Sequence, residues 1–172
     1  MNSKLIRELL AKFEEISGDS IEVTGPIDEA EIAEVEKKMG IIFHPELREY
    51  YSTFGSLLIN NVDQYGPRLV NRFNSQIKLP ADEAGIIIQT EEARRLCKSL
   101  SKSSICIWRE DVSWMVLFNN DSGLISFYDG VKKEFTMYDD IEPESFTLES
   151  YIILKIQGAI DAELEWQEKQ GK

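Results

Sequence analysis

Four short runs of β-branched and aromatic residues restrict the fold of this chain more than any other feature. They are SICIWR, WMVLFN, LISFYD and EFTMYD, and they occupy residues 104–109, 114–119, 124–129 and 134–139. Runs of this composition are typical of β-strands, and segments such as NNDSG and DGVKK between them are typical of turns. Connections this short join antiparallel strands, because parallel strands need a long crossover. The sequence therefore predicts a four-stranded antiparallel meander.

Three amphipathic helices are expected in the first 55 residues. The first ends near Gly18, and the second lies between Asp28, a candidate N-cap, and Gly40. The third begins at Pro45, since the first turn of a helix does not use the N–H that proline lacks, and it stops at Gly55. Its apolar face is broad and aromatic, so it must pack on a large apolar surface. The meander is the obvious candidate.

The other periodic segments are shorter or lie at the end of the chain. A helix is expected at residues 90–100, capped by Thr90, and a long final helix begins near Ser145 or Thr147. Apolar residues at 57–59 and 86–88 suggest additional edge strands.

Residues 60–85 have little periodicity and contain four Gly or Pro residues. This favours an irregular insertion with at most one short strand. A length of 172 residues suits one domain with a proper core, so we expect residues 1–172 to form a single domain. The predicted class is α+β, with a mostly antiparallel sheet of about four to six strands packed against N-terminal and C-terminal helices.

The formal net charge is −12, and it is unevenly distributed. From Glu110 onward the chain has 14 acidic and 5 basic residues. This charge repels phosphate backbones, so direct nucleic-acid binding is not expected. A basic protein partner would be attracted, although a negative surface that only maintains solubility is the alternative.

Neither an apolar export signal nor a membrane-spanning run is present in the sequence. Cys97 and Cys106 are the only cysteines, and we interpret both as reduced thiols of a cytoplasmic protein that does not bind a membrane. A disulfide between them is the less supported alternative.

In its order of elements the chain resembles the SUKH superfamily, which includes fungal cell-wall-synthesis regulators and many bacterial immunity proteins. The resemblance covers residues 24–157, and the expected insertion at 60–85 lies within this range. It is carried by the segments IDEAEIAEVEKKMG, HPELREYYSTFG and SFTLESYI. The matching positions are Ile32, Glu36, Gly40, Pro45, Tyr50, Tyr51, Phe54, Gly55, Phe146 and Tyr151.

This resemblance implies a binding protein without catalysis. Bacterial members look like immunity proteins that bind and neutralise a toxin domain, often a nuclease or deaminase. An acidic surface suits such a role, because the active site of a nuclease is usually basic. The alternative is a regulatory or scaffolding protein that binds host partners, as the fungal members suggest. The oligomeric state is left open between a monomer and a weak dimer.

Signals for catalysis, a cofactor or a metal are weak in the sequence. The single histidine, His44, precedes Pro45 and is interpreted as a capping or surface residue. NNDSG lacks the later ligands of a calcium loop and is interpreted as a hairpin turn. We therefore expect no enzyme, no cofactor and no metal site.

The candidate partner-binding residues are carboxylates at the predicted strand ends, together with two aromatic residues. Loops on a rigid scaffold commonly carry recognition, and aromatic residues commonly form the buried centre of an interface. For Trp108 and Trp114, core or cross-strand packing is favoured over contact with a partner. The candidates are Glu110, Asp111, Trp114, Asp121, Asp129, Asp139, Asp140 and Tyr65.

Overall fold

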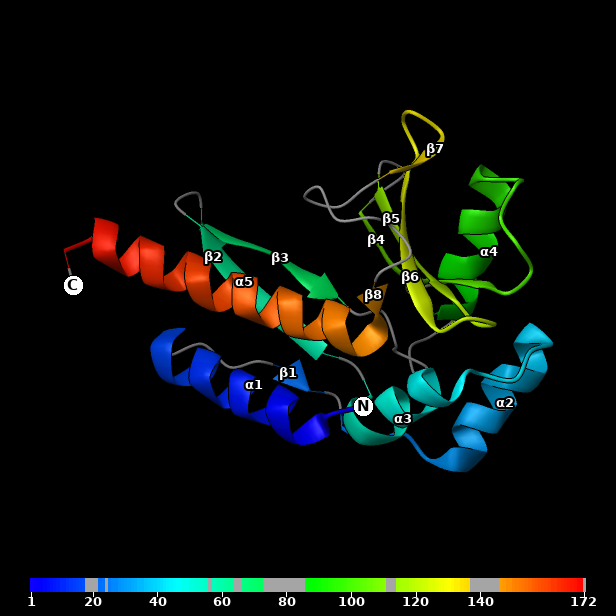
Figure 1. Cartoon of the computed structure of the whole chain (residues 1–172), viewed down its shortest axis with the longest axis horizontal. Coiled ribbons are helices and arrows are strands. Elements are labelled where there is room, and N and C mark those ends of the chain that lie inside the picture. Colours follow the sequence, from blue (N-terminus) through cyan, green and yellow to red (C-terminus); the bar gives the residue numbers. More distant parts are fainter. Residues whose placement is uncertain are drawn as a thin grey trace.

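The computed structural model is an α+β fold with five helices in the part of the chain that it describes (Figure 1). It describes residues 1–17, 22–23, 25–55, 57–63, 66–72, 86–110, 114–136 and 146–171. The helices are α1 (Ser3–Ser17), α2 (Glu29–Met39), α3 (Pro45–Phe54), α4 (Ile86–Leu96) and α5 (Leu148–Lys169). The strands are β1 (Glu22–Val23), β2 (Leu57–Asp63), β3 (Gly66–Arg72), β4 (Ser104–Glu110), β5 (Trp114–Asn119), β6 (Leu124–Asp129), β7 (Glu134–Thr136) and β8 (Phe146–Thr147).

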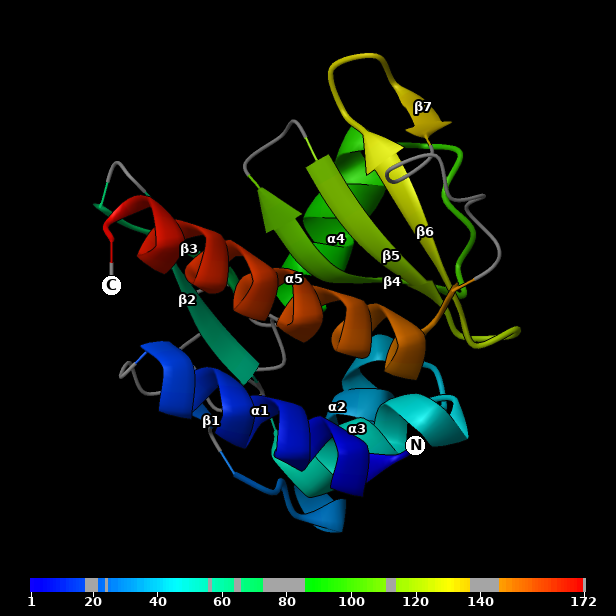
Figure 2. The same ribbon diagram turned by 60° about the vertical axis from the view of Figure 1, so that its left-hand side comes forward.

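The predicted meander is confirmed as one of two antiparallel sheets. It has the order β4-β5-β6-β7, and β8 pairs with β6. The second sheet has the order β1-β2-β3. Helix α5 crosses the molecule beside both sheets, and α1 lies along it with the two N-terminal ends together (Figures 1 and 2). The predicted class, an antiparallel sheet packed against N-terminal and C-terminal helices, is therefore correct.

The expectation of an irregular insertion at 60–85 is wrong for its first half. The edge strand expected at 57–59 is the start of β2, which forms a hairpin with β3 in a separate sheet. Pro67 is tolerated because it is near the start of β3, an edge strand in which an N–H can be missing. The backbone pairing of a hairpin needs no apolar alternation, so periodicity gave no signal. Residues 73–85 lie outside the described residues.

The strand expected at 86–88 and the helix start at Thr90 are also wrong. Helix α4 begins at Ile86 and ends at Leu96, four residues earlier than predicted. Thr90 lies within this helix, and its Oγ1 accepts the Cys106 N–H at 3.1 Å. Arg94 donates to the Ser104 carbonyl at 3.3 Å. Helix α4 thus satisfies backbone groups on the outer side of β4, a tertiary role that local propensity does not indicate.

Most helix ends follow the predicted punctuation. Gly40 is the left-handed C-cap of α2, with φ 68°, and Pro45 is at the first turn of α3. Asp28 occupies the N-cap of α2, as predicted, but its side chain makes no capping hydrogen bond. A capping box forms at α5, where the side chain and backbone of Thr147 bond with Ser150.

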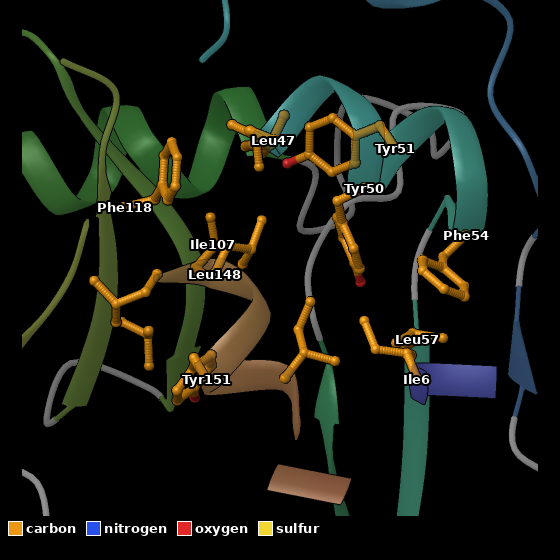
Figure 3. Packing of buried hydrophobic residues seen from close by; sticks show 14 of the residues in the cluster. Ile6, Leu47, Tyr50, Tyr51, Phe54, Leu57, Ile107, Phe118, Leu148 and Tyr151 are labelled. Atoms are coloured by element: carbon orange, nitrogen blue, oxygen red, sulfur yellow. The ribbon is translucent and has the colours of Figure 1, made fainter. Parts of the chain in front are cut away.

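The main hydrophobic core joins the helices to one face of the five-stranded sheet. The aromatic face of α3 is its centre, and Tyr51 and Phe54 are at most 1% exposed. Figure 3 shows α3 side chains facing the sheet residues Ile107 and Phe118 and the α5 residues Leu148 and Tyr151. The other face of the sheet carries a smaller core beneath α4, built from Ala93, Cys97, Cys106, Met115, Leu117 and Tyr128.

A buried carboxylate fixes the angle between α2 and α3. Glu36 is 7% exposed and accepts the Phe43 N–H at 2.8 Å. Both of its oxygens accept hydrogen bonds from Arg48 Nη1, at 3.0 and 2.9 Å. Arg48 Nη2 also donates to Glu29. Helix α2, the link after it and α3 are therefore held by one charge-assisted network.

A second set of contacts holds the α2–α3 link against the β5–β6 turn. The His44 N–H donates to Asn120 Oδ1 at 2.7 Å, and Asn120 Nδ2 donates to the Ile42 carbonyl at 2.7 Å. His44 Nδ1 caps α3 by accepting the Glu46 N–H at 3.3 Å, as its capping interpretation predicted. Gly123 lies directly beneath the imidazole ring. This turn aligns the helices with the sheet.

Substitution of Arg48 tests the buried network. Arg48→Met is expected to destabilise the fold by about 2 kcal/mol, because Glu36 would keep its burial and lose its cation. Chemical denaturation of Arg48→Met and the wild type measures the difference in free energy of unfolding. Lys38→Met is the matched control, since Lys38 pairs with Glu34 on the exposed side of α2. Equal losses in the two variants would contradict a special role for Arg48.

Alanine at Gly123 tests the contact between the turn and the link. Gly123 has φ +74°, and an added Cβ would lie 2.7 Å from His44 Cε1. Gly40 has a similar φ of +68° with no atom within 4 Å of such a Cβ. Gly40→Ala should therefore cost only backbone strain, about 1 kcal/mol, and Gly123→Ala at least about 2 kcal/mol. Thermal denaturation of the two variants checks this order, and equal losses would contradict the packing argument.

Candidate interaction surface

The sheet register brings several predicted partner-binding positions to one strand end. Glu110 pairs with Trp114, Trp114 pairs with Asp129, and Asp129 pairs with Glu134. We call these four residues the strand-end row. Figure 2 shows this end of the sheet at the top of the view, away from α1 and α3. The row follows from antiparallel pairing, because the last residue of one strand lies beside the first residue of its neighbour.

Asp121 lies at the opposite end of the same strands. It is exposed in the turn between β5 and β6, beside the link contacts of Asn120. Strands β5 and β6 each have six residues, so this turn is about 17 Å from the strand-end row. The predicted carboxylates therefore divide between two separate places.

Asp129 is largely engaged by its own turn. Its Oδ1 accepts the N–H groups of Val131 and Lys132, each at 2.9 Å, and Oδ2 lies 3.7 Å from Lys132 Nζ. Its side chain is 15% exposed. Hydrogen bonds from the backbone of Lys132 and Val131 and the charge of Lys132 hold the pKa of Asp129 below its usual range. Asp129 shapes the hairpin, and only a small part of its carboxylate faces solvent.

Trp114 forms the aromatic part of the row. It is half-buried, and its ring centroid lies 6.0 Å from that of Phe127. Both Trp114 and Trp108 pack against the edge of the main core, which agrees with the favoured packing interpretation. In the strand register, Trp114 lies between Glu110 and Asp129.

The structure leaves part of the predicted site without description. Glu110 is described as the last position of β4, and its side chain is not. Asp111, Asp139, Asp140 and Tyr65 lie outside the described residues. Their contribution to binding stays a prediction.

Two exposed apolar residues beside the row were missed by the sequence analysis. Val131 is 73% exposed in the β6–β7 turn, and Phe135 is 50% exposed in β7. The segment DGVKK predicted only a turn, and EFTMYD predicted only a strand. A valine inside a turn segment was the signal that could have identified this surface, since turns seldom need an apolar side chain.

Phe135 rests on a hydrogen-bonded pair at the edge of the smaller core. Its ring makes an edge contact with Tyr128 at 5.5 Å between centroids. The hydrogen bond to Cys97, together with burial, raises the pKa of Tyr128 to about 12. Burial alone would raise the pKa of the Cys97 thiol, but hydrogen bonds from Ser99, Tyr128 and the Leu100 backbone lower it. Cys97 and Cys106 are both buried free thiols.

Comparison with known proteins adds no name to this arrangement. No protein-family model matches the chain, and no curated protein matches its sequence. Within the described ranges, none of the helices is both long enough and apolar enough to cross a membrane.

Asp129 gives a pH-dependent prediction. Its folded pKa is lowered, so the stabilisation from its charge is present above its ordinary pKa of about 4 and is lost as the pH falls through the folded value. Asp129→Asn keeps an oxygen acceptor for the turn and removes the charge. The wild type should therefore be more stable than Asp129→Asn at pH 7, and acidification should narrow this gap.

Urea denaturation of both proteins over a pH series measures this effect. Asp129→Ala serves as the comparison, because it also removes the acceptor and should be the least stable of the three at every pH. A gap between wild type and Asp129→Asn that is unchanged at low pH would contradict the charge argument.

Proposed function

We propose that this protein is a non-catalytic member of the SUKH superfamily that binds and neutralises a toxin domain as an immunity protein. The observation that carries the proposal is the strand-end row, in which half-buried Trp114 lies between acidic positions on a rigid sheet. The proposed partner is a basic domain, such as a nuclease or another toxin that acts on nucleic acids. Binding is stoichiometric, and the complex forms in the cytoplasm.

Electrostatics supports a basic partner. The chain carries a net charge of −12, and 14 of its acidic residues lie from Glu110 onward. Such a field steers a basic domain toward the surface and speeds association more than it increases final affinity. In the proposed complex, Glu110 and the neighbouring Asp111 face Lys or Arg side chains that the toxin uses for nucleic acid.

The aromatic side chain of Trp114 supports specific binding, in addition to the attraction between charges. Interfaces commonly depend on a few aromatic residues that become buried at their centre, with charged groups around them. Trp114 is held by Phe127 behind it, so it loses little conformational freedom when a partner covers its exposed part.

The SUKH assignment is supported by what the motif residues do in this fold. Glu36 ties α2 to the link and to α3, Gly40 is a left-handed cap, and Pro45 begins α3. Five further motif residues are all buried in the main core, namely Tyr50, Tyr51, Phe54, Phe146 and Tyr151. A binding family would be identified by residues that determine the scaffold in this way. The partner of each member would depend on its surface.

Co-expression tests the proposed function. The wild type should restore growth to cells that produce a nuclease toxin domain encoded beside it, and the two proteins should co-purify as a complex. Glu110→Lys combined with Asp111→Lys should weaken the complex at least about tenfold. Higher salt should slow association of the wild type.

Asp121→Lys is compared with Glu110→Lys alone as the matched control, because each variant reverses one carboxylate and the two positions lie at opposite ends of the strands. Rescue lost only with the Glu110 and Asp111 substitutions supports the strand-end row. Loss only with Asp121→Lys would move the interface to the β5–β6 turn. Failure with every neighbouring toxin, together with recovery of a host protein, would favour the regulatory or scaffolding alternative.

A further inference from the structure

We propose that two copies of this chain associate through the β6–β7 hairpin, in a symmetric and weak dimer. The hairpin surface consists of Val131, Phe135 and the four charged residues around them, which are Asp129, Lys132, Lys133 and Glu134. This inference goes beyond the proposed toxin binding, although two of these residues, Asp129 and Glu134, also belong to the strand-end row. It is also testable with the purified chain alone.

The hairpin concentrates exposed apolar surface in one place. In the described part of the chain, the large apolar side chains that are exposed are Leu5, Ile42, Val131, Phe135 and Leu164. Only Val131 and Phe135 belong to one hairpin. The hairpin also projects from the body of the molecule in both views (Figures 1 and 2). A projecting pair of apolar side chains is accessible to a second molecule and marks an interaction surface.

The hairpin holds these side chains in place before any contact is made. Asp129 accepts two turn N–H groups, and the Lys133 N–H donates to the Asp129 carbonyl at 2.7 Å. Lys133 has φ 61°, a left-handed conformation that a lysine adopts only when its surroundings require it. Phe135 is supported by Tyr128. Little conformational entropy is therefore lost when the surface is covered.

Charge favours a second copy as the occupant. The chain as a whole is at −12, so two copies repel each other over most of their surface. Around Val131 and Phe135 the charges are balanced, with two acidic and two basic residues. In a two-fold symmetric contact the same patch lies on both copies. Each acidic residue of one copy can then face a basic residue of the other, so a balanced patch can pair with itself.

In the described ranges β7 pairs only with β6, so the hairpin lies at the end of the sheet order. The surface is small compared with a stable interface, which buries about 1,600 Å² in total. The dimer is therefore weak and depends on protein concentration.

Sedimentation velocity of the purified chain from about 10 µM to about 1 mM tests the dimer. The wild type should show an increasing dimer fraction over this range. Val131→Asp should weaken self-association at least about tenfold, because it places an unpaired charge at the apolar centre. Ile42→Asp is the matched control, since Ile42 is 78% exposed and lies away from the hairpin. Circular dichroism verifies that both variants are folded.

A charge exchange tests the symmetry of the contact. Lys132→Glu makes the patch acidic and Glu134→Lys makes it basic, so each variant alone should dimerise less than the wild type. A mixture of the two should recover association, because the patches then complement each other. The inference is overturned if the wild type stays monomeric at about 1 mM, or if Ile42→Asp weakens association as much as Val131→Asp. It is also overturned if the mixture associates no better than its components.

Discussion

The rest of the structure depends on the buried carboxylate of Glu36. An ionised group at 7% exposure is tolerated only when it is paired and hydrogen-bonded, and here Arg48 and the Phe43 N–H provide both. These contacts fix α3 relative to α2. Helix α3 can then place its aromatic face against the sheet and α5, where the main core forms. An apolar contact would not define this angle as sharply, because it is not directional.

The β5–β6 turn then fixes the orientation of these helices relative to the meander. Asn120 bonds both sides of the link, and Gly123 allows the His44 ring to approach closely. One end of the strands is thereby used to build the fold, while the strand-end row lies at the other end. The proposed binding surface and the contacts that build the fold therefore lie at different ends of the strands. A partner can engage Trp114 and its acidic neighbours without disturbing the contacts that hold the helices.

The sequence predicted best where local and tertiary requirements agree. Strands β5 and β6 have the predicted bounds because apolar and aromatic runs between turn residues leave no competing structure. The prediction failed at α4, where three isoleucines favoured a strand, and at β2–β3, where a hairpin needed no periodicity. At the candidate surface, the carboxylates at strand ends could be predicted. Their separation into two places follows from the alternating direction of the predicted antiparallel strands, whereas Val131 was hidden within a turn segment.

By itself, the sequence determined the α+β class, the antiparallel meander, the capped helices and the acidic character of the surface. These follow from short-range physics, namely side-chain periodicity, the backbone preferences of Gly and Pro, and the count of charges. Only the tertiary structure decided that Thr90 would bond β4, that Glu36 would be buried with Arg48, and that Trp114 and Asp129 would become neighbours. Each of these unites residues distant in the sequence, and the packing of the whole chain selects such contacts.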